Sequence, residues 1–167
     1  MNDAHLHMVV NHFPIIGTIF GLGILITGIV LKNKVITNVA YVLFVVAAIF
    51  AFFSMATGEG AEEIAEKLPS VTHQIIHEHE EMAEKLALVL YALGLVSLIG
   101  LFLNFKNHAK ANLASYLALI IALVGVFLGK QTGTTGGEVR HTEIRENTSP
   151  GANSSEQEEI ENERDAD

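Results

Sequence analysis

The stretch "VVNHFPIIGTIFGLGILITGIVL", residues 9–31, decides the fold class, because His12 is its only ionisable side chain. Three further runs contain no Asp, Glu, Lys, Arg or His: 35–56, 86–105 and 113–129. A helix rises ~1.5 Å per residue, so roughly 20 apolar residues cross the ~30 Å hydrocarbon layer of a membrane. We therefore predict four transmembrane helices, at about residues 9–31, 35–56, 84–105 and 112–129.

The composition agrees with a membrane protein and argues against several functions. The chain is 50% hydrophobic and 17% charged, with a net charge of −9 and no cysteine. Any metal must therefore be bound by His, Glu, Asp or Met, and thiol chemistry and iron–sulfur clusters are excluded. The negative charge and the lack of a basic patch argue against nucleic-acid binding. The serines of the spans have no neighbouring His/Asp motif, which argues against a hydrolase.

Two short connections that carry lysines set the expected topology. "KNK" at 32–34 joins the first two spans, and "FKNHAKAN" at 105–112 joins the last two. Short connections make their flanking helices antiparallel neighbours, so we predict an all-α, up-down four-helix transmembrane bundle. Because Lys and Arg concentrate in cytoplasmic loops, we expect both connections inside the cell and both termini on the non-cytoplasmic side.

The segments between and after the spans predict three further features. "AEEIAEKLP" at 61–69 follows a Thr57-Gly58 break and has apolar residues at helical spacing, which predicts a short interfacial amphipathic helix. Ser70 or Thr72 can then cap a helix that starts near His73 and continues unbroken into the third span. Residues 142–167 have a net charge of −7 and few large apolar residues, so we expect the membrane domain, 1–141, to precede a disordered acidic tail.

The histidines gather on one side of the predicted bundle. Seven of the eight lie there: His5, His7, His12, His73, His77, His79 and His141. Histidine is a common metal ligand and the usual axial ligand of haem. This distribution predicts a cofactor or metal site on the non-cytoplasmic side, and only His108 lies on the lysine side.

The motif "HEHEE" at 77–81 lies at the start of the third membrane helix, where helical geometry separates its residues. At ~100° per residue, His79 falls near the centre of the apolar face and should point into the bundle. Another face carries His73, His77 and Glu80, at spacings that suit either a shared ion or simple solvation. Glu81 and Lys85 form an expected i,i+4 ion pair.

Two kinds of site fit this pattern. His12 lies within an apolar run, where a neutral or coordinated imidazole costs less than a charged one, so His12 and His79 would face each other and hold haem b, with His141 as a third candidate. A transition-metal site fits almost as well, with candidate ligands His7, His73, His77, Glu78 and Glu80. Copper, zinc and non-haem iron are not separable without geometry.

The leading hypothesis is a multi-pass membrane protein that binds haem b or a transition metal and serves electron transfer; whether it also catalyses a reaction is left open, and the sequence leans against it. Its partners would be the lipid bilayer and a redox partner protein or membrane complex. Two alternatives remain open: a non-redox module for metal-ion binding, sensing or transport, and a structural membrane subunit whose histidines form a polar rim.

Several short motifs carry a resemblance to a known family. They are "HMVVNHFPIIG" at 7–17, "TG" at 57–58, a histidine at the start of the third membrane helix, and "TGGEVRH" at 135–141. Over about residues 7–141 the chain resembles the four-helix bacterial inner-membrane proteins of a domain-of-unknown-function family. The resemblance implies a bacterial inner-membrane protein with a redox association and no established activity.

Overall fold

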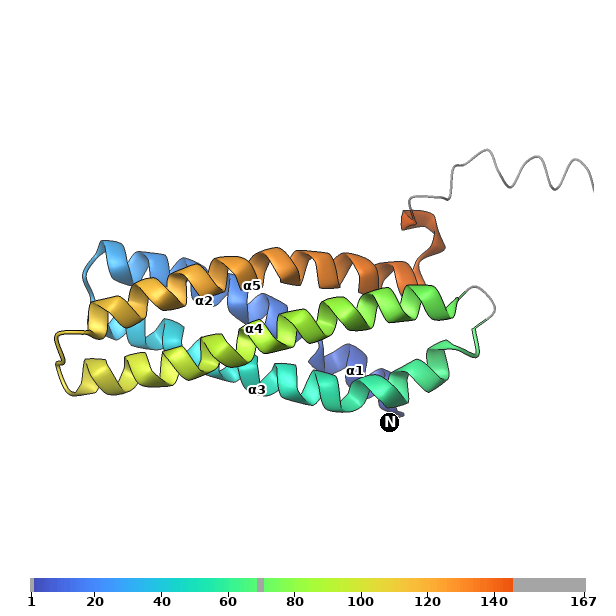
Figure 1. The fold of residues 1–167 in the computed structure, drawn as a ribbon, viewed down its shortest axis with the longest axis horizontal. Coiled ribbons are helices and arrows are strands. Elements are labelled where there is room, and N and C mark those ends of the chain that lie inside the picture. The colour runs from blue at the N-terminus through green and yellow to red at the C-terminus, as the bar shows by residue number, and fades with distance from the viewer. Residues whose placement is uncertain (1, 69–70, 146–167) are drawn as a thin grey trace, which may run out of the picture.

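The computed structural model describes residues 2–68 and 71–145. Within these residues the regular structure is entirely helical, as predicted (Figure 1), with the elements α1 Asp3–Val10, α2 His12–Val30, α3 Lys34–Ala65, α4 His73–Phe105, α5 Ala111–Arg140 and the 3₁₀ turn η1 Thr142–Ile144. Most of the expected acidic tail, from residue 146 onward, lies outside the described residues, as does Pro69.

Among the described residues, four stretches are long and apolar enough to cross a membrane: Asp3–Val30, Lys34–Ala65, His73–Phe105 and Ala111–Arg140. The first is divided into α1 and α2 at Asn11. Pro14 explains the division, because it has no backbone N–H to donate to the carbonyl of Val10 and is tolerated only in the first turn of α2. Asn11 keeps a helical backbone conformation, so the chain continues in nearly the same direction.

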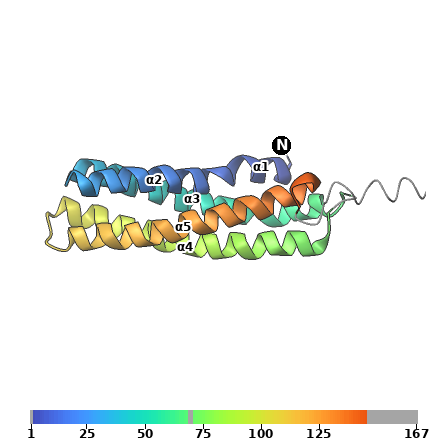
Figure 2. The ribbon, with the colours of Figure 1, turned by 90° about the horizontal axis from the view of Figure 1, so that it is seen from above.

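The helices form an up-down bundle (Figures 1 and 2). Sequential helices pack against each other from α2 to α5, and α5 closes the ring by packing on α2. The short helix α1 lies against α3, at the end of the bundle where α3 ends, α4 begins and α5 ends. We call this end the histidine end. The opposite end, which carries Lys32, Lys34, Lys106 and Lys110, is the lysine end.

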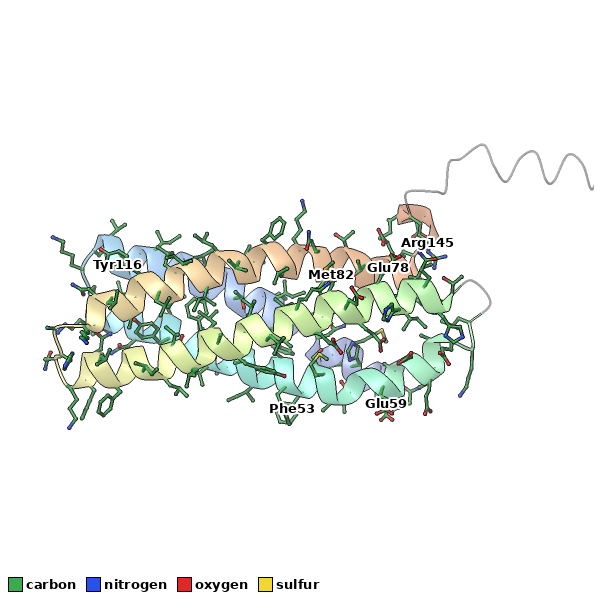
Figure 3. All side chains as sticks on the ribbon, in the orientation of Figure 1. Phe53, Glu59, Glu78, Met82, Tyr116 and Arg145 are labelled. Atoms are coloured by element: carbon green, nitrogen blue, oxygen red, sulfur yellow. The ribbon has the colours of Figure 1, made fainter. Side chains whose placement is uncertain are left out.

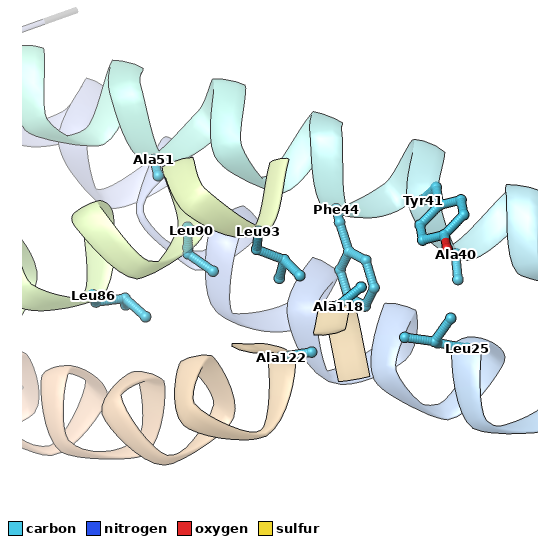
Figure 4. Close-up of a cluster of buried hydrophobic side chains, with 10 residues drawn as sticks. All are labelled: Leu25, Ala40, Tyr41, Phe44, Ala51, Leu86, Leu90, Leu93, Ala118 and Ala122. Atoms are coloured by element: carbon cyan, nitrogen blue, oxygen red, sulfur yellow. The ribbon is translucent and has the colours of Figure 1, made fainter. Parts of the chain in front are cut away.

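The centre of the bundle is filled by a few large side chains that pack against small residues (Figure 4). Tyr41 and Phe44 of α3 are fully buried, together with leucines and alanines of the other helices. A Cβ on Gly21 would lie 2.5 Å from the Phe44 ring, and one on Gly100 would strike the Tyr41 ring. Lipid is as apolar as leucine, so close packing against small residues replaces the hydrophobic drive that holds soluble bundles together.

The helices are longer than the hydrocarbon layer, and the excess lies at the histidine end. α3, α4 and α5 have 32, 33 and 30 residues, which corresponds to ~45–50 Å against ~30 Å of hydrocarbon. In each of these helices, the stretch without Asp, Glu, Lys or Arg begins at the lysine end. The turns near Glu59, Glu78 and Glu138 lie beyond that stretch, towards the histidine end. Figure 3 shows Glu59 and Glu78 at the end opposite Tyr116. The histidine end therefore extends beyond the hydrocarbon as a small helical head.

Two differences from the expected helices build this head. The segment at 61–68 is not a separate interfacial helix, because α3 continues through Thr57 and Gly58 to Ala65. The helix that contains the last expected span is longer than that span, because α5 continues to Arg140. The start of α4 is as predicted: it begins at His73, where the Thr72 hydroxyl accepts a hydrogen bond from the Ile75 amide at 3.4 Å.

Candidate functional site

Two histidine rings from different helices lie between the helices of the head. His7 comes from α1 and His79 from α4, and both residues are half-buried. An electrostatic interaction connects the two rings. The inward position of His79 is confirmed, because its ring is half-buried and contacts α5 through Thr135.

Hydrogen bonding fixes the tautomer of the His7 ring. Its Nδ1 lies 3.1 Å from the carbonyl oxygen of Ser54 and 3.2 Å from the Thr57 hydroxyl, both on α3. A carbonyl oxygen only accepts hydrogen bonds, so Nδ1 carries the hydrogen and donates it. The lone pair of the neutral ring is then on Nε2.

The His79 ring has the same tautomer for a related reason. Its Nδ1 lies 3.1 Å from the Thr135 hydroxyl of α5. That hydroxyl donates its one hydrogen to the carbonyl of Thr132 at 3.2 Å, so it accepts from the ring. Metal-binding histidines are commonly held in this way, with one nitrogen donating to a protein oxygen and the other binding the metal.

Small and polar residues of α5 hold it close to His79. A Cβ on Gly136 would lie 2.9 Å from Cε1 of the His79 ring and 3.3 Å from its Nδ1. One turn earlier, the Thr132 hydroxyl donates to the Met82 carbonyl of α4 at 3.1 Å. The sequence "TTGG" at 134–137 therefore continues α5 as a helix and gives the His79 ring its place.

Two carboxyl groups from different helices are neighbours at the histidine end. Burial and the nearby Glu62 of α3 raise the pKa of the Glu80 carboxyl of α4. The charges of His77 and Glu84 also act on Glu80. Glu80 therefore belongs to an acidic contact between α3 and α4, on a face of α4 separate from the one that carries His79.

The expected inward position of His12 is wrong. Its ring is exposed, and Nδ1 lies 2.9 Å from the carbonyl oxygen of Met8 in the same stretch of chain. His12 follows His7 by five residues, which turns it by ~140° on a regular helix. When His7 lies between the helices, His12 must therefore face outward.

The other candidate ligands are spread over the exposed surface of the histidine end. His73 is paired with Glu66 at 2.9 Å, His77 with Glu81 at 3.5 Å, and Glu78 accepts a hydrogen bond from Gln74 at 2.9 Å. Lys85 also pairs with Glu81, at 3.1 Å, so the predicted i,i+4 ion pair is confirmed. These contacts are those of a solvated helix surface and do not assemble an ion site.

His141 lies apart from the interior histidines. It follows α5, is exposed, and its Nδ1 lies 2.9 Å from the Glu143 carboxylate. Hydrogen bonds from its own backbone amide and from the His141 ring lower the pKa of the Glu143 carboxyl. The glycines before His141 pack against His79 and Ile144 and do not bring His141 to the interior pair.

Within residues 2–68 and 71–145, no three His, Asp or Glu side chains come together in an arrangement that could hold a metal ion. The broad cluster expected from the sequence thus reduces to the pair His7 and His79. The sequence contains a signal for His7, because "HMVVNHFP" offers two histidines on different faces of one helix. The helix that carries them has no polar face, so the sequence does not indicate which of the two histidines lies inside.

Comparison with known proteins identifies the family. The sequence profile described as "Predicted membrane protein (DUF2231)" matches residues 4–143, which covers α1 to α5 except Asp3, the first residue of α1. No curated protein and no solved structure matches the chain. The match extends over most of the 167 residues and agrees with four helices able to cross a membrane. The chain therefore belongs to the predicted membrane proteins of the DUF2231 family.

Proposed function

We propose that this membrane protein holds a transition-metal centre between His7 and His79 and uses it for electron transfer. The observation that carries the proposal is the shared arrangement of the two rings. Each lies between helices, each is anchored through Nδ1 to a protein oxygen, and each therefore has its lone pair on Nε2. Exposed histidines with carboxylate partners, such as His73 and His77, lack this arrangement.

The number of ligands favours haem b over a bare ion. His7 and His79 would be sufficient to hold haem, whereas zinc and non-haem iron need further protein ligands. No third His, Asp or Glu joins the pair among the described residues. Haem held by these two residues would supply one-electron redox chemistry, which favours electron transfer over catalysis.

The surroundings of the pair hold the two rings in place. A Cβ on Gly136 would lie 2.9 Å from Cε1 of the His79 ring, so α5 packs directly on that ring. The hydroxyls of Thr57 and Thr135 fix the two rings from α3 and α5. The residues that would hold the centre thus belong to four different elements, and its binding would stabilise the head of the bundle.

The test is an absorption spectrum with metal analysis of protein purified from haem-replete cells. We expect a Soret band that shifts on dithionite reduction and is lost in His7→Ala and in His79→Ala. The exposed histidines supply matched controls, so His12→Ala and His77→Ala should keep the band.

Other results would assign the site differently. A colourless protein with bound zinc, copper or iron that depends on the same two residues would support the non-redox metal module. A colourless and metal-free protein would leave the structural reading, in which the two histidines only tie α1, α3, α4 and α5 together. Loss of the band in His12→Ala alone would show that the wrong pair has been chosen.

A further inference from the structure

A polar cavity of about 310 Å³ lies at the lysine end, far from the histidine pair. Its wall combines residues of α2, α3, α4 and α5 with those of the connection at 31–33. The polar part of the wall consists of Lys32, Asn33, Lys34, Thr37, Asn104, Asn112, Ser115 and Tyr116. Figure 3 shows Tyr116 at this end of the bundle. The size is at the lower limit of ligand-sized pockets, ~300 Å³.

The charge around this cavity is positive and not compensated by nearby acids. Of the described residues that line it, two are lysines and none is acidic. The sequence contains no Asp or Glu between residues 4 and 58 or between 85 and 137. The acidic residues that flank the spans therefore lie towards the histidine end. Ammonium groups without a carboxylate partner attract anions, and phosphate is an anion that lysine commonly binds.

The two cavity lysines have distinct local surroundings. Lys34 donates from Nζ to the Asn107 side-chain oxygen at 2.8 Å, which ties the two connections together and leaves further N–H donors on the same ammonium. Lys32 has a φ of 49°, a left-handed conformation that usually favours glycine or asparagine. A lysine at this position carries a conformational cost, and its charge at the cavity rim would offset that cost.

The other two lysines of this end provide an internal contrast. Lys106 lies over the rings of Phe102 and Phe105, at 6.0 and 5.8 Å from their centroids, and is not part of the cavity wall. Lys110 is likewise absent from the wall. A lysine that only orients the protein in the membrane does not need to lie in a cavity wall. The difference between Lys32 and Lys34 on one side and Lys106 and Lys110 on the other therefore separates ligand binding from a general effect of positive charge.

The cavity lies beside surface that faces lipid. Val30, Leu31 and Val35 flank the connection and are 72%, 62% and 72% exposed, and Leu113 near Asn112 is 64% exposed. Such apolar surface at the edge of the spans is covered by acyl chains in a membrane. A ligand with a phosphate in the cavity and hydrocarbon on this surface would satisfy both regions at once.

We propose that this cavity binds the phosphate of an anionic phospholipid headgroup, with Lys32 and Lys34 supplying the charge and Asn33 and Asn112 the hydrogen bonds. Basic pockets between transmembrane helices recognise such headgroups through the same chemistry. The site is at the end of the bundle opposite the histidine pair, so it is independent of the proposed metal centre.

The test is native mass spectrometry of the full-length protein in detergent, titrated with phosphatidylglycerol or with phosphatidylcholine of the same acyl chains. We expect about tenfold preference for phosphatidylglycerol, and about fivefold weaker binding for Lys32→Gly and for Lys34→Gln, from the typical contribution of one lysine. The matched controls Lys106→Gln and Lys110→Gln should bind within about twofold of the natural protein.

The Lys32→Gly variant separates folding from binding. Glycine adopts a φ of 49° without strain, so this variant should melt no lower than the natural protein while it loses lipid. Asn112→Asp provides a second variant that keeps the side-chain size, and its carboxylate should abolish the preference for phosphatidylglycerol.

Three results would overturn the proposal. Equal losses in all four lysine variants would indicate general attraction to positive charge. Equal binding of the two lipids would show that the cavity does not recognise an anionic headgroup. Complete displacement of phosphatidylglycerol by millimolar inorganic phosphate would show that free phosphate, and not a lipid, is the ligand.

Discussion

The two ends of the bundle are both polar, but they are built in different ways. At the lysine end, the helices turn back within a few residues, and Lys32 and Asn107 take left-handed backbone conformations, with φ of 49° and 50°. At the histidine end, α3, α4 and α5 extend beyond the hydrocarbon-length runs. There a side-chain hydrogen bond of His7 ties α1 to α3, and those of His79 and Thr132 tie α4 to α5.

The difference shows which end tolerates a larger side chain in place of glycine. The lysine end relies on close approach of backbones: a Cβ on Gly28 would lie 2.6 Å from the Thr37 hydroxyl and 2.7 Å from its backbone nitrogen. The histidine end relies on side chains that rotate, as Gly136 meets only the ring of His79. A rigid backbone neighbour cannot yield to a new methyl group, whereas a side chain yields at the cost of its hydrogen bond.

The largest expected effect concerns the sidedness of the two ends. The four lysines of one end predict that it faces the cytoplasm, so a reporter fused after Asp167 should lie on the opposite side of the membrane. A reporter inserted into the connection at 31–33 should give the complementary, cytoplasmic signal. Activity of the terminal fusion inside the cell would reverse the assignment and place the histidine end in the cytoplasm.

The next effect tests the backbone contact at the lysine end. Gly28→Ala should lower the free energy of unfolding by about 2 kcal/mol or more, because the new methyl group must push α2 away from the start of α3. Gly23 of the same helix has open space around it, so Gly23→Ala is the matched control and should be neutral or slightly stabilising. Thermal melting in detergent measures both, and equal melting temperatures would contradict the close α2–α3 packing.

The smallest effect tests the side-chain contact at the histidine end. Gly136→Ala should cost only about 1 kcal/mol, because the His79 ring can rotate away and forfeit its hydrogen bond to Thr135. Gly133 of the same helix meets only Ile15, at 3.9 Å, so Gly133→Ala should cost nothing. Thermal melting again compares the pair. A loss in Gly136→Ala as large as that in Gly28→Ala would show that the ring cannot move.

Much of the fold could be predicted from the sequence because lipid imposes a simple rule on it. Runs without charge must be helical across the hydrocarbon, since every backbone polar group has to be bonded within the segment. The start of α4 was also predictable, because Thr72 caps it and the pattern after His73 has both apolar and polar faces. The same amphipathic pattern placed His79 inside and paired Glu81 with Lys85.

The helix boundaries at the head could not be predicted, because local signals there favour an end to the helix. Gly58 and Gly136 are poor helix formers, each costing about 1 kcal/mol relative to alanine. α3 and α5 nevertheless continue through them. Packing between long helices outweighs such local preferences, and at Gly136 the missing side chain is what allows α5 to lie against His79.

By itself, then, the sequence determined four membrane helices in an all-α chain, charge of opposite sign at the two ends, and His79 as an interior residue. Only the tertiary structure decided that His7, and not His12, is its partner. The physical reason is that residues 8–31 are apolar on nearly every face, so hydropathy contains no information on which face meets protein and which meets lipid. The break at Asn11 and the packing of α1 on α3 make that choice.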